Sequence, residues 1–248
     1  IEAFTRNSIH SFLIYPWPST TAMLQFNNPT NKQIGRLRMT ESAFTTYYDF
    51  RWPFVYNAAV WLSTVKEQLG KDIEIDWQPL SLSQINSNEE GEYKFWEQPE
   101  ALDGSDNTLL AHRAGLAAKR QGKEAFESFF MSLLKARHEE KQDLTDPAVI
   151  DGALEASGID KGRFMEDLAD PDLLRELGES HTKAVEEHGA FGVPTYVFPN
   201  GHAAFIKMFV PPAEQAVGMY DNLMQMVNDF QYVGEVKRPQ PPWPHGVI

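Results

Sequence analysis

The chain has no cysteine among its 248 residues. Disulfide bonds, thiolate metal sites and thiol–disulfide exchange by the chain itself are therefore excluded. A cysteine-free protein is compatible with either redox environment, so this absence does not fix the compartment.

Long apolar runs are also lacking. None approaches the roughly 20 residues that span a bilayer, and the best candidate, residues 11–15, stops at Pro16. The same segment has neither the basic flank nor the long apolar core of a signal peptide. The sequence therefore predicts no transmembrane segment and a cytoplasmic location.

Positive charge is scarce. The chain has 22 basic and 35 acidic residues, which gives a formal charge of −13. This field repels phosphate backbones and anionic lipid, so neither nucleic acid nor a membrane surface is expected as a partner. The apolar fraction of 42% and the charged fraction of 23% are typical of a globular protein.

The first clear pattern is a strand, a helix and a second strand. Residues 44–50 are rich in aromatic residues and threonine, which predicts a strand. From Asn57 to Leu69, apolar residues recur on one helical face, and Gly70 suits the helix end. Residues 73–77 alternate as a strand does. These segments predict a βαβ unit with parallel strands and a right-handed crossover.

A block of helices and a second β region follow. Residues 108–121 and 124–137 have helical patterns, and Asp146 and Asp170 each precede a proline, as an N-cap precedes the first helical position. The second of these helices is expected to run from Pro171 to about His188.

Near the end of the chain, residues 194–198 and 202–209 predict a hairpin around a Pro-Asn-Gly turn, and residues 213–230 predict a final helix. The order βαβ, helical block, ββα indicates one α/β sheet with a helical insertion.

Two motifs stand at the two ends of this block. One is DFRWPFVY at residues 49–56, which follows the pattern D-F-x-C-P-x-C except at its two cysteines; the other is GVPTYVF at residues 192–198, which matches G-V-P-T-x-x-F. Over about residues 43–230 the chain resembles the DsbA-like thioredoxin-fold family, which includes 2-hydroxychromene-2-carboxylate isomerases and kappa-class glutathione transferases. The resemblance implies that Pro194 is cis. The resemblance implies a thioredoxin fold with an inserted α-helical domain.

The resemblance also implies five segments. Residues 1–40 form an N-terminal extension, 41–100 the first half of the thioredoxin fold and 101–188 the helical insertion. Residues 189–232 form the second half, and 233–248 form a proline-rich tail.

At the reactive positions the chain departs from the family. Trp52 stands where the nucleophilic cysteine is expected, and Val55 stands at the second cysteine position. Tryptophan offers an indole N–H but no nucleophile, so enzymatic activity is left open. Asp49 is a candidate for proton transfer; the alternative is that its carboxylate caps the adjacent turn.

The resemblance implies a binding site made of Trp52, Pro53 and Phe54 from the first motif, and of Val193, Pro194 and Thr195 from the second. In this family the residue before the proline, here Val193, offers its backbone to an extended peptide or to glutathione. Trp52 is interpreted either as a plug that closes this site or as a residue that lines a new one.

Histidines give no metal prediction. His181 and His188 share a helical face without a third ligand, so a solvated face is the simpler interpretation. His138 belongs to a charge run and is expected to be exposed.

Three functions are compatible with these features. The favoured one is a DsbA-family protein that has lost redox chemistry and acts in binding or assembly, without a cofactor. The second is a glutathione-dependent isomerase or transferase. The third is a structural subunit of a larger complex, a homodimer included, that contacts its partner peptide or protein through residues 1–40 and 233–248. There Trp17 and Trp243, each between prolines, are partner anchors or fold back on the domain.

Overall fold

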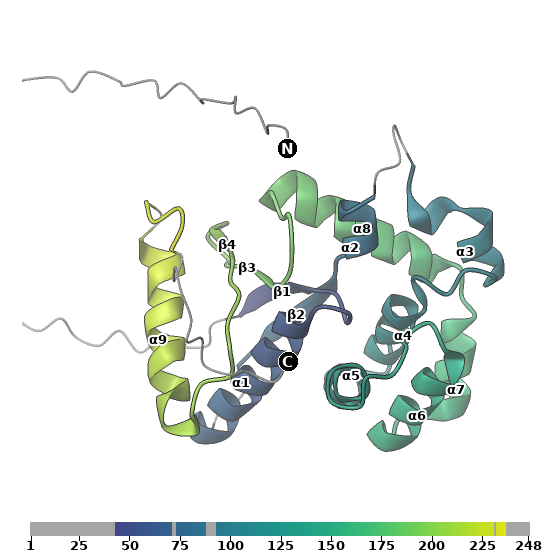
Figure 1. Ribbon diagram of the computed structural model, residues 1–248, viewed down its shortest axis with the longest axis horizontal. Coiled ribbons are helices and arrows are strands. Elements are labelled where there is room, and N and C mark those ends of the chain that lie inside the picture. The colour runs from purple at the N-terminus through teal and green to yellow at the C-terminus, as the bar shows by residue number, and fades with distance from the viewer. Residues whose placement is uncertain (1–42, 71–72, 88–92, 231, 237–248) are drawn as a thin grey trace, which may run out of the picture. The chain divides into compact units, whose positions relative to one another are not determined.

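A computed structural model describes residues 43–70, 73–87, 93–230 and 232–236 (Figure 1). The predicted N-terminal extension, Trp17, Trp243 and residues 237–248 of the predicted tail lie outside these residues, so the roles predicted for them stay predictions. None of the described helices is both long and apolar enough to cross a membrane.

Four strands form one sheet in the order β2-β1-β3-β4. They are β1 (Phe44–Tyr48), β2 (Ile75–Pro79), β3 (Thr195–Val197) and β4 (Ala203–Phe205). β1 and β2 are parallel, whereas β1 pairs with β3, and β3 with β4, in antiparallel fashion. The βαβ and ββα regions therefore share one sheet, and the predicted α/β thioredoxin fold is confirmed.

Two long helices belong to the thioredoxin-fold part of the chain. They are α1 (Pro53–Leu69) and α9 (Ala213–Asp229), and the Trp61 indole Nε1 donates to the Ala216 carbonyl across their contact at 3.0 Å. Helix α1 ends at Gly70, whose φ of 60° is the left-handed conformation that glycine adopts without strain.

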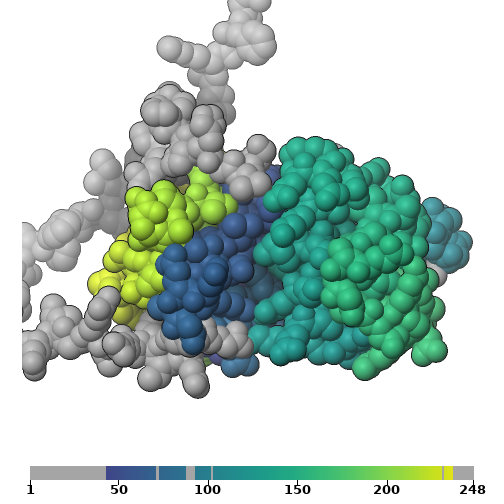
Figure 2. All heavy atoms as spheres, turned by 90° about the horizontal axis from the view of Figure 1, so that it is seen from below, coloured from purple at the N-terminus to yellow at the C-terminus, as the bar shows by residue number. Residues whose placement is uncertain are grey.

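Between β2 and β3 lies the helical insertion, which Figure 1 shows in teal and green. Its elements are α2 (Leu82–Ile85), the 3-10 helix η1 (Phe95–Glu97), α3 (Pro99–Asp103), α4 (Leu110–Lys119), α5 (Lys123–His138), α6 (Pro147–Ser157), α7 (Lys161–Leu168) and α8 (Asp172–His188). Figure 2 shows these helices packed on one side of α1, with α9 on its other side.

The predicted helix starts are close to the observed ones. Asp146 accepts a hydrogen bond from the Ala148 N–H and caps α6. Asp170 accepts from the Asp172 N–H, and α8 begins one residue later than predicted. Helix α7 was not predicted, although the Asp160 side chain caps it by accepting from the Arg163 N–H.

Strand ends were predicted less well. β1 stops at Tyr48 instead of residue 50, because the chain turns at Asp49 to enter α1, and β2 begins two residues late, at Ile75, the residue paired with Phe44. The strand predicted over residues 202–209 was wrong beyond Phe205. There the Met208 carbonyl accepts from the Asn57 side chain of α1 at 3.0 Å, which draws the backbone out of the sheet.

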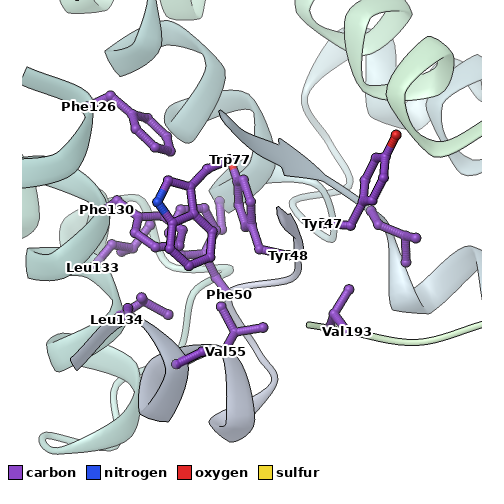
Figure 3. Close-up of a cluster of buried hydrophobic side chains, with 14 of the residues drawn as sticks. Tyr47, Tyr48, Phe50, Val55, Trp77, Phe126, Phe130, Leu133, Leu134 and Val193 are labelled. Carbon is purple, nitrogen blue, oxygen red and sulfur yellow. The ribbon is translucent and has the colours of Figure 1, made fainter. Parts of the chain in front are cut away.

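An aromatic core joins the sheet to the insertion (Figure 3). Tyr48, Phe50 and Trp77 meet Phe126 and Phe130 of α5, with ring centroids 4.7 to 6.3 Å apart. Helix α4 approaches the same rings closely at Gly115, where an added Cβ would lie 2.8 Å from the Tyr48 hydroxyl. The insertion is therefore packed directly beneath the turn that carries the first motif.

Candidate binding site

The first motif forms the turn between β1 and α1. The Trp52 N–H donates to the Asp49 carbonyl at 3.1 Å, and the Val55 N–H donates to the Trp52 carbonyl at 3.0 Å. Pro53 is the first residue of α1, where the missing N–H is not required and the fixed φ suits a helix. The sequence therefore builds a rigid strand–turn–helix junction with Trp52 at its apex.

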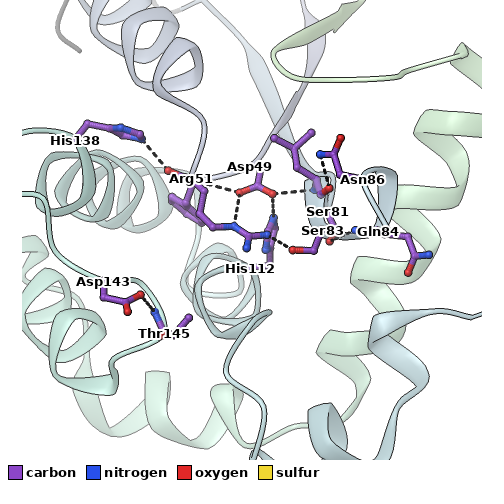
Figure 4. Close-up of polar contacts among 12 residues, drawn as sticks. Asp49, Arg51, Ser81, Ser83, Gln84, Asn86, His112, His138, Asp143 and Thr145 are labelled. Atoms are coloured by element: carbon purple, nitrogen blue, oxygen red, sulfur yellow. Dashed lines mark hydrogen bonds and ion pairs between the residues drawn. The ribbon is translucent and has the colours of Figure 1, made fainter. Parts of the chain in front are cut away.

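The buried side chain of Asp49 stabilises this junction through hydrogen bonds (Figure 4). Its carboxylate is fully buried and accepts from the backbone N–H groups of Arg51 and Leu82, each at 2.9 Å. Nε of Arg51 lies 3.5 Å from the same carboxylate, and Nε2 of His112 lies 3.7 Å from it. These contacts tie the junction to the start of α2 and to α4.

The electrostatics of this cluster follow from burial. Burial raises the pKa of Asp49, but His112, Arg51 and the two backbone N–H groups outweigh it and hold the pKa below its usual range. Burial also lowers the pKa of His112, although the Asp49 carboxylate opposes this change. Neither ring nitrogen of His112 has a hydrogen-bond partner among the described residues, and the ring borders a cavity of about 40 Å³. The role of Asp49 in proton transfer stays a prediction.

A second histidine of the insertion contacts the junction. Nε2 of His138 lies 2.8 Å from the Phe50 carbonyl, and its ring stacks on Tyr56 with centroids 5.6 Å apart. The expectation that His138 is exposed was wrong, because the end of α5 turns this side chain toward the junction. His181 is likewise buried, so the solvated-face interpretation fails for it. Among the described residues, no group of acidic residues and histidines is placed to hold a metal ion.

The two positions that correspond to the family's cysteines have different surroundings. Val55 is fully buried in the core. Trp52 is partly buried, and its Nε1 atom is buried without a hydrogen-bond partner among the described residues. Its ring lies 6.0 Å from the Phe54 ring, at the surface of the junction.

The second motif begins in the loop before β3 and includes that strand. Its Val193–Pro194 peptide bond is cis, and the Thr195 hydroxyl donates to the Gly192 carbonyl at 2.7 Å. The Pro194 carbonyl accepts from the Ile206 N–H at 3.2 Å. Val193 is only 1% exposed, and Pro194 and Thr195 are also buried. In this conformation the Val193 backbone therefore does not face solvent.

Aromatic side chains cover the surface where the two motifs meet. The Phe205 ring packs so closely on Gly192 that an added Cβ there would lie 3.1 Å from it, and it also contacts Phe191 with centroids 4.9 Å apart. Phe54 contacts Phe209 at 5.9 Å. Trp52, Phe54 and Phe205 are joined by the Lys207 ammonium, which lies 5.3, 5.7 and 5.4 Å from their ring centroids.

We call this surface the ring face; its members are Trp52, Phe54, Phe191, Phe205 and Phe209. The structure thus brings Trp52 and Phe54 together with the loop of the second motif, but through residues that the sequence reasoning missed. The signal was present in FIKMF at residues 205–209, where Phe205, Lys207 and Phe209 alternate. The larger described cavity, about 610 Å³, lies between α8 and the 3-10 helix, and neither Trp52 nor Pro194 lines it.

The fold is a thioredoxin fold, and an aromatic surface lies over the junction between β1 and α1. Comparison with known families agrees: the model described as DSBA-like thioredoxin domain matches residues 44–220. The chain belongs to this family.

Individual relatives are distant. Over 197 residues the chain is 28% identical to the uncharacterized protein Rv2286c of Mycobacterium tuberculosis, covering 79% of this chain and 81% of the relative. A solved 2-hydroxychromene-2-carboxylate isomerase has a TM-score of 0.50 at 15% identity, covering 78% of this chain and 100% of that one. The disulfide oxidoreductase DsbA of Proteus mirabilis has a TM-score of 0.47 at 14% identity, covering 78% and 90%. At 15% identity, the likeness to the solved isomerase shows a shared fold alone.

Proposed function

We propose that this protein is a non-redox binding or assembly member of the DsbA-like family, and that it holds an extended segment of a protein partner on the ring face. The observation that carries this proposal is the aromatic surface at Trp52: two groups of contacting rings are linked by the Lys207 ammonium, and Phe191 has 67% of its surface exposed. Exposed aromatic side chains are typical anchors of protein interfaces.

Chemistry by the chain is restricted at this site. The chain supplies no thiol, Trp52 offers no nucleophile, and Val55 is enclosed by the core. The rings therefore support binding rather than covalent catalysis.

An extended segment fits the neighbouring sheet edge. β4 is the terminal strand of the sheet order, so among the described residues it pairs with β3 alone, and Ala203 is exposed. An edge strand can accept a further strand through its unpaired backbone groups. Phe205 ends β4 and is also a member of the ring face, so main-chain pairing and aromatic contacts are available to one peptide.

Binding to a pool of N-acetylated, C-amidated peptides of about eight residues tests the proposal, with isothermal titration calorimetry of the selected peptides. We expect saturable binding that Phe191→Ala weakens about tenfold, as loss of an interface anchor does. Met165→Ala is the matched control, because Met165 is 48% exposed on α7, outside the ring face. Absence of saturable binding, or equal effects of the two substitutions, would contradict the proposal.

A turnover assay separates binding from enzymatic activity. We expect no turnover of thiol substrates by the intact protein. Turnover that persists unchanged in Trp52→Ala would show that another residue carries out chemistry and would overturn the non-redox assignment.

A further inference from the structure

We infer that the partner segment carries a carboxylate side chain, and that Lys207 is the specificity-determining residue that binds it. This inference rests on the function proposed above and adds the chemical class of the bound segment.

The ammonium of Lys207 occupies the middle of the ring face. Its Nζ lies within 6 Å of three ring centroids, those of Trp52, Phe54 and Phe205. At such distances the negative faces of the rings attract a cation. Lys207 is nevertheless exposed. The rings therefore fix the position of the ammonium while its N–H donors remain open to a ligand on the solvent side.

Among the described residues, no carboxylate forms an ion pair with Lys207. Other described lysines do have such partners: Lys66 is 2.7 Å from Glu127, and Lys119 is 2.7 Å from Asp76. The chain has 35 acidic residues, so acids are plentiful. Held by rings and without an ion-pair partner in the described part of the chain, Lys207 is thus an available cation in a mostly acidic protein.

Helix α1 adds to the positive potential at the same place. It has 17 residues and begins at Pro53, between two members of the ring face, and its first turn contains no acidic residue. The N-terminal end of a helix favours negative charge. The Lys207 ammonium and the start of α1 therefore both complement a carboxylate, whereas a partner lysine or arginine would be repelled.

The geometry also sets the order of the bound side chains. Phe205 is the last residue of β4, and Lys207 follows just beyond the strand, with its ammonium 5.4 Å from the Phe205 ring centroid. A strand added along β4 that continues past Phe205 reaches Lys207. The segment that fits has an apolar side chain over Phe205 and a carboxylate further along, opposite Lys207.

Matched peptides test this assignment. The tightest peptide from the pool is made with Glu, Gln or Lys at each position in turn, with both ends blocked so that the side chain is the only source of a carboxylate. With the intact protein we expect one position at which Glu binds about tenfold more tightly than Gln, and Lys more weakly than Gln. Raising the salt concentration is expected to reduce this preference.

Variants of Lys207 test whether this residue binds the carboxylate. Lys207→Met is expected to abolish the preference for Glu over Gln, whereas Lys207→Arg is expected to retain this preference. Lys135→Met, a change at an exposed lysine of α5, is the control and is expected to leave the preference unchanged.

The possible outcomes distinguish this inference from the proposed function. Equal binding of the Glu and Gln peptides, or a preference for Lys, would overturn the role of Lys207 and leave the ring face as a binding surface. A preference for Glu that survives in Lys207→Met would also overturn it. No binding of any peptide would overturn both.

Discussion

Trp52 carries the central change at the scale of single residues. The residue is the N-cap of α1, where a side chain that accepts a hydrogen bond is usual, and its side chain makes no cap hydrogen bond. Its ring contacts Phe54 and the Lys207 ammonium instead. The N-terminal end of α1, which favours negative charge, therefore lies beside a side chain that carries none.

Replacing Trp52 by cysteine tests whether the site favours an anion. In Trp52→Cys the single thiol lies at the N-terminal end of α1 and close to Lys207, so its pKa is expected to fall below the usual value of about 8.5. The rate of alkylation by iodoacetamide as a function of pH measures this pKa. Tyr232→Cys is the control, because Tyr232 is 93% exposed. The same pH dependence in both variants would show that the site no longer favours an anion.

At the scale of elements, the junction depends on how closely the insertion packs beneath it. Helix α4 lies against β1 and the junction turn at Gly115, where an added Cβ would be 2.8 Å from the Tyr48 hydroxyl and 3.1 Å from the Phe50 ring. Both rings are almost fully buried, so neither can move aside without disturbing the core. Through this contact, the position of α4 constrains the residues just before Trp52.

Two glycine substitutions separate the effect of close packing on stability from the effect of helix propensity. Gly115→Ala is expected to destabilise the protein by about 1–3 kcal/mol, because overpacking outweighs the better helix propensity of alanine. Gly152→Ala in α6 is the matched control, since an added Cβ there has no atom within 4 Å. That change is expected to stabilise the protein by roughly 0.5–1 kcal/mol. Urea unfolding measures both; a Gly115→Ala protein as stable as the control variant would contradict the packing argument.

At the scale of the whole molecule, buried histidines link stability to pH. Burial lowers the pKa of His112, His138 and His181, the last to about 4. Below the ordinary pKa of about 6.5 the unfolded chain takes up protons that the folded protein does not. Stability is therefore full above about pH 6.5 and falls as the pH drops below it.

His181→Phe tests this linkage, because it keeps a ring beside Trp96, whose centroid is 4.9 Å from that of His181. The difference between a folded pKa of about 4 and an unfolded pKa of 6.5 corresponds to a loss of roughly 3 kcal/mol in the free energy of unfolding once the pH is below both values. Urea unfolding at pH 7.5 and at pH 4.5 measures how much the free energy of unfolding falls on acidification, and we expect a smaller fall in the variant than in the intact protein. The value at pH 7.5 shows separately whether the substitution disturbs packing. An equal fall in both proteins would contradict the prediction.

The sequence alone was sufficient to predict the order βαβ, helical block, ββα, and to exclude thiol chemistry by the chain. Local signals were sufficient there: Pro53 and Asp146 mark helix starts, Gly70 and Gly189 mark helix ends, and the two motifs mark the ends of the insertion. These features depend on residues close together in the chain, so one sequence is enough to predict them.

The surroundings of Trp52 depend on contacts between distant parts of the chain. His112 and His138 reach Asp49 and Phe50 from helices 60 or more residues away in the chain, and Lys207 reaches Trp52 from the region after β4. Periodicity and capping rules act over a few residues and contain no information about such contacts. For this reason the sequence predicted candidate residues, whereas only the folded chain places a cation among the aromatic rings beside Trp52.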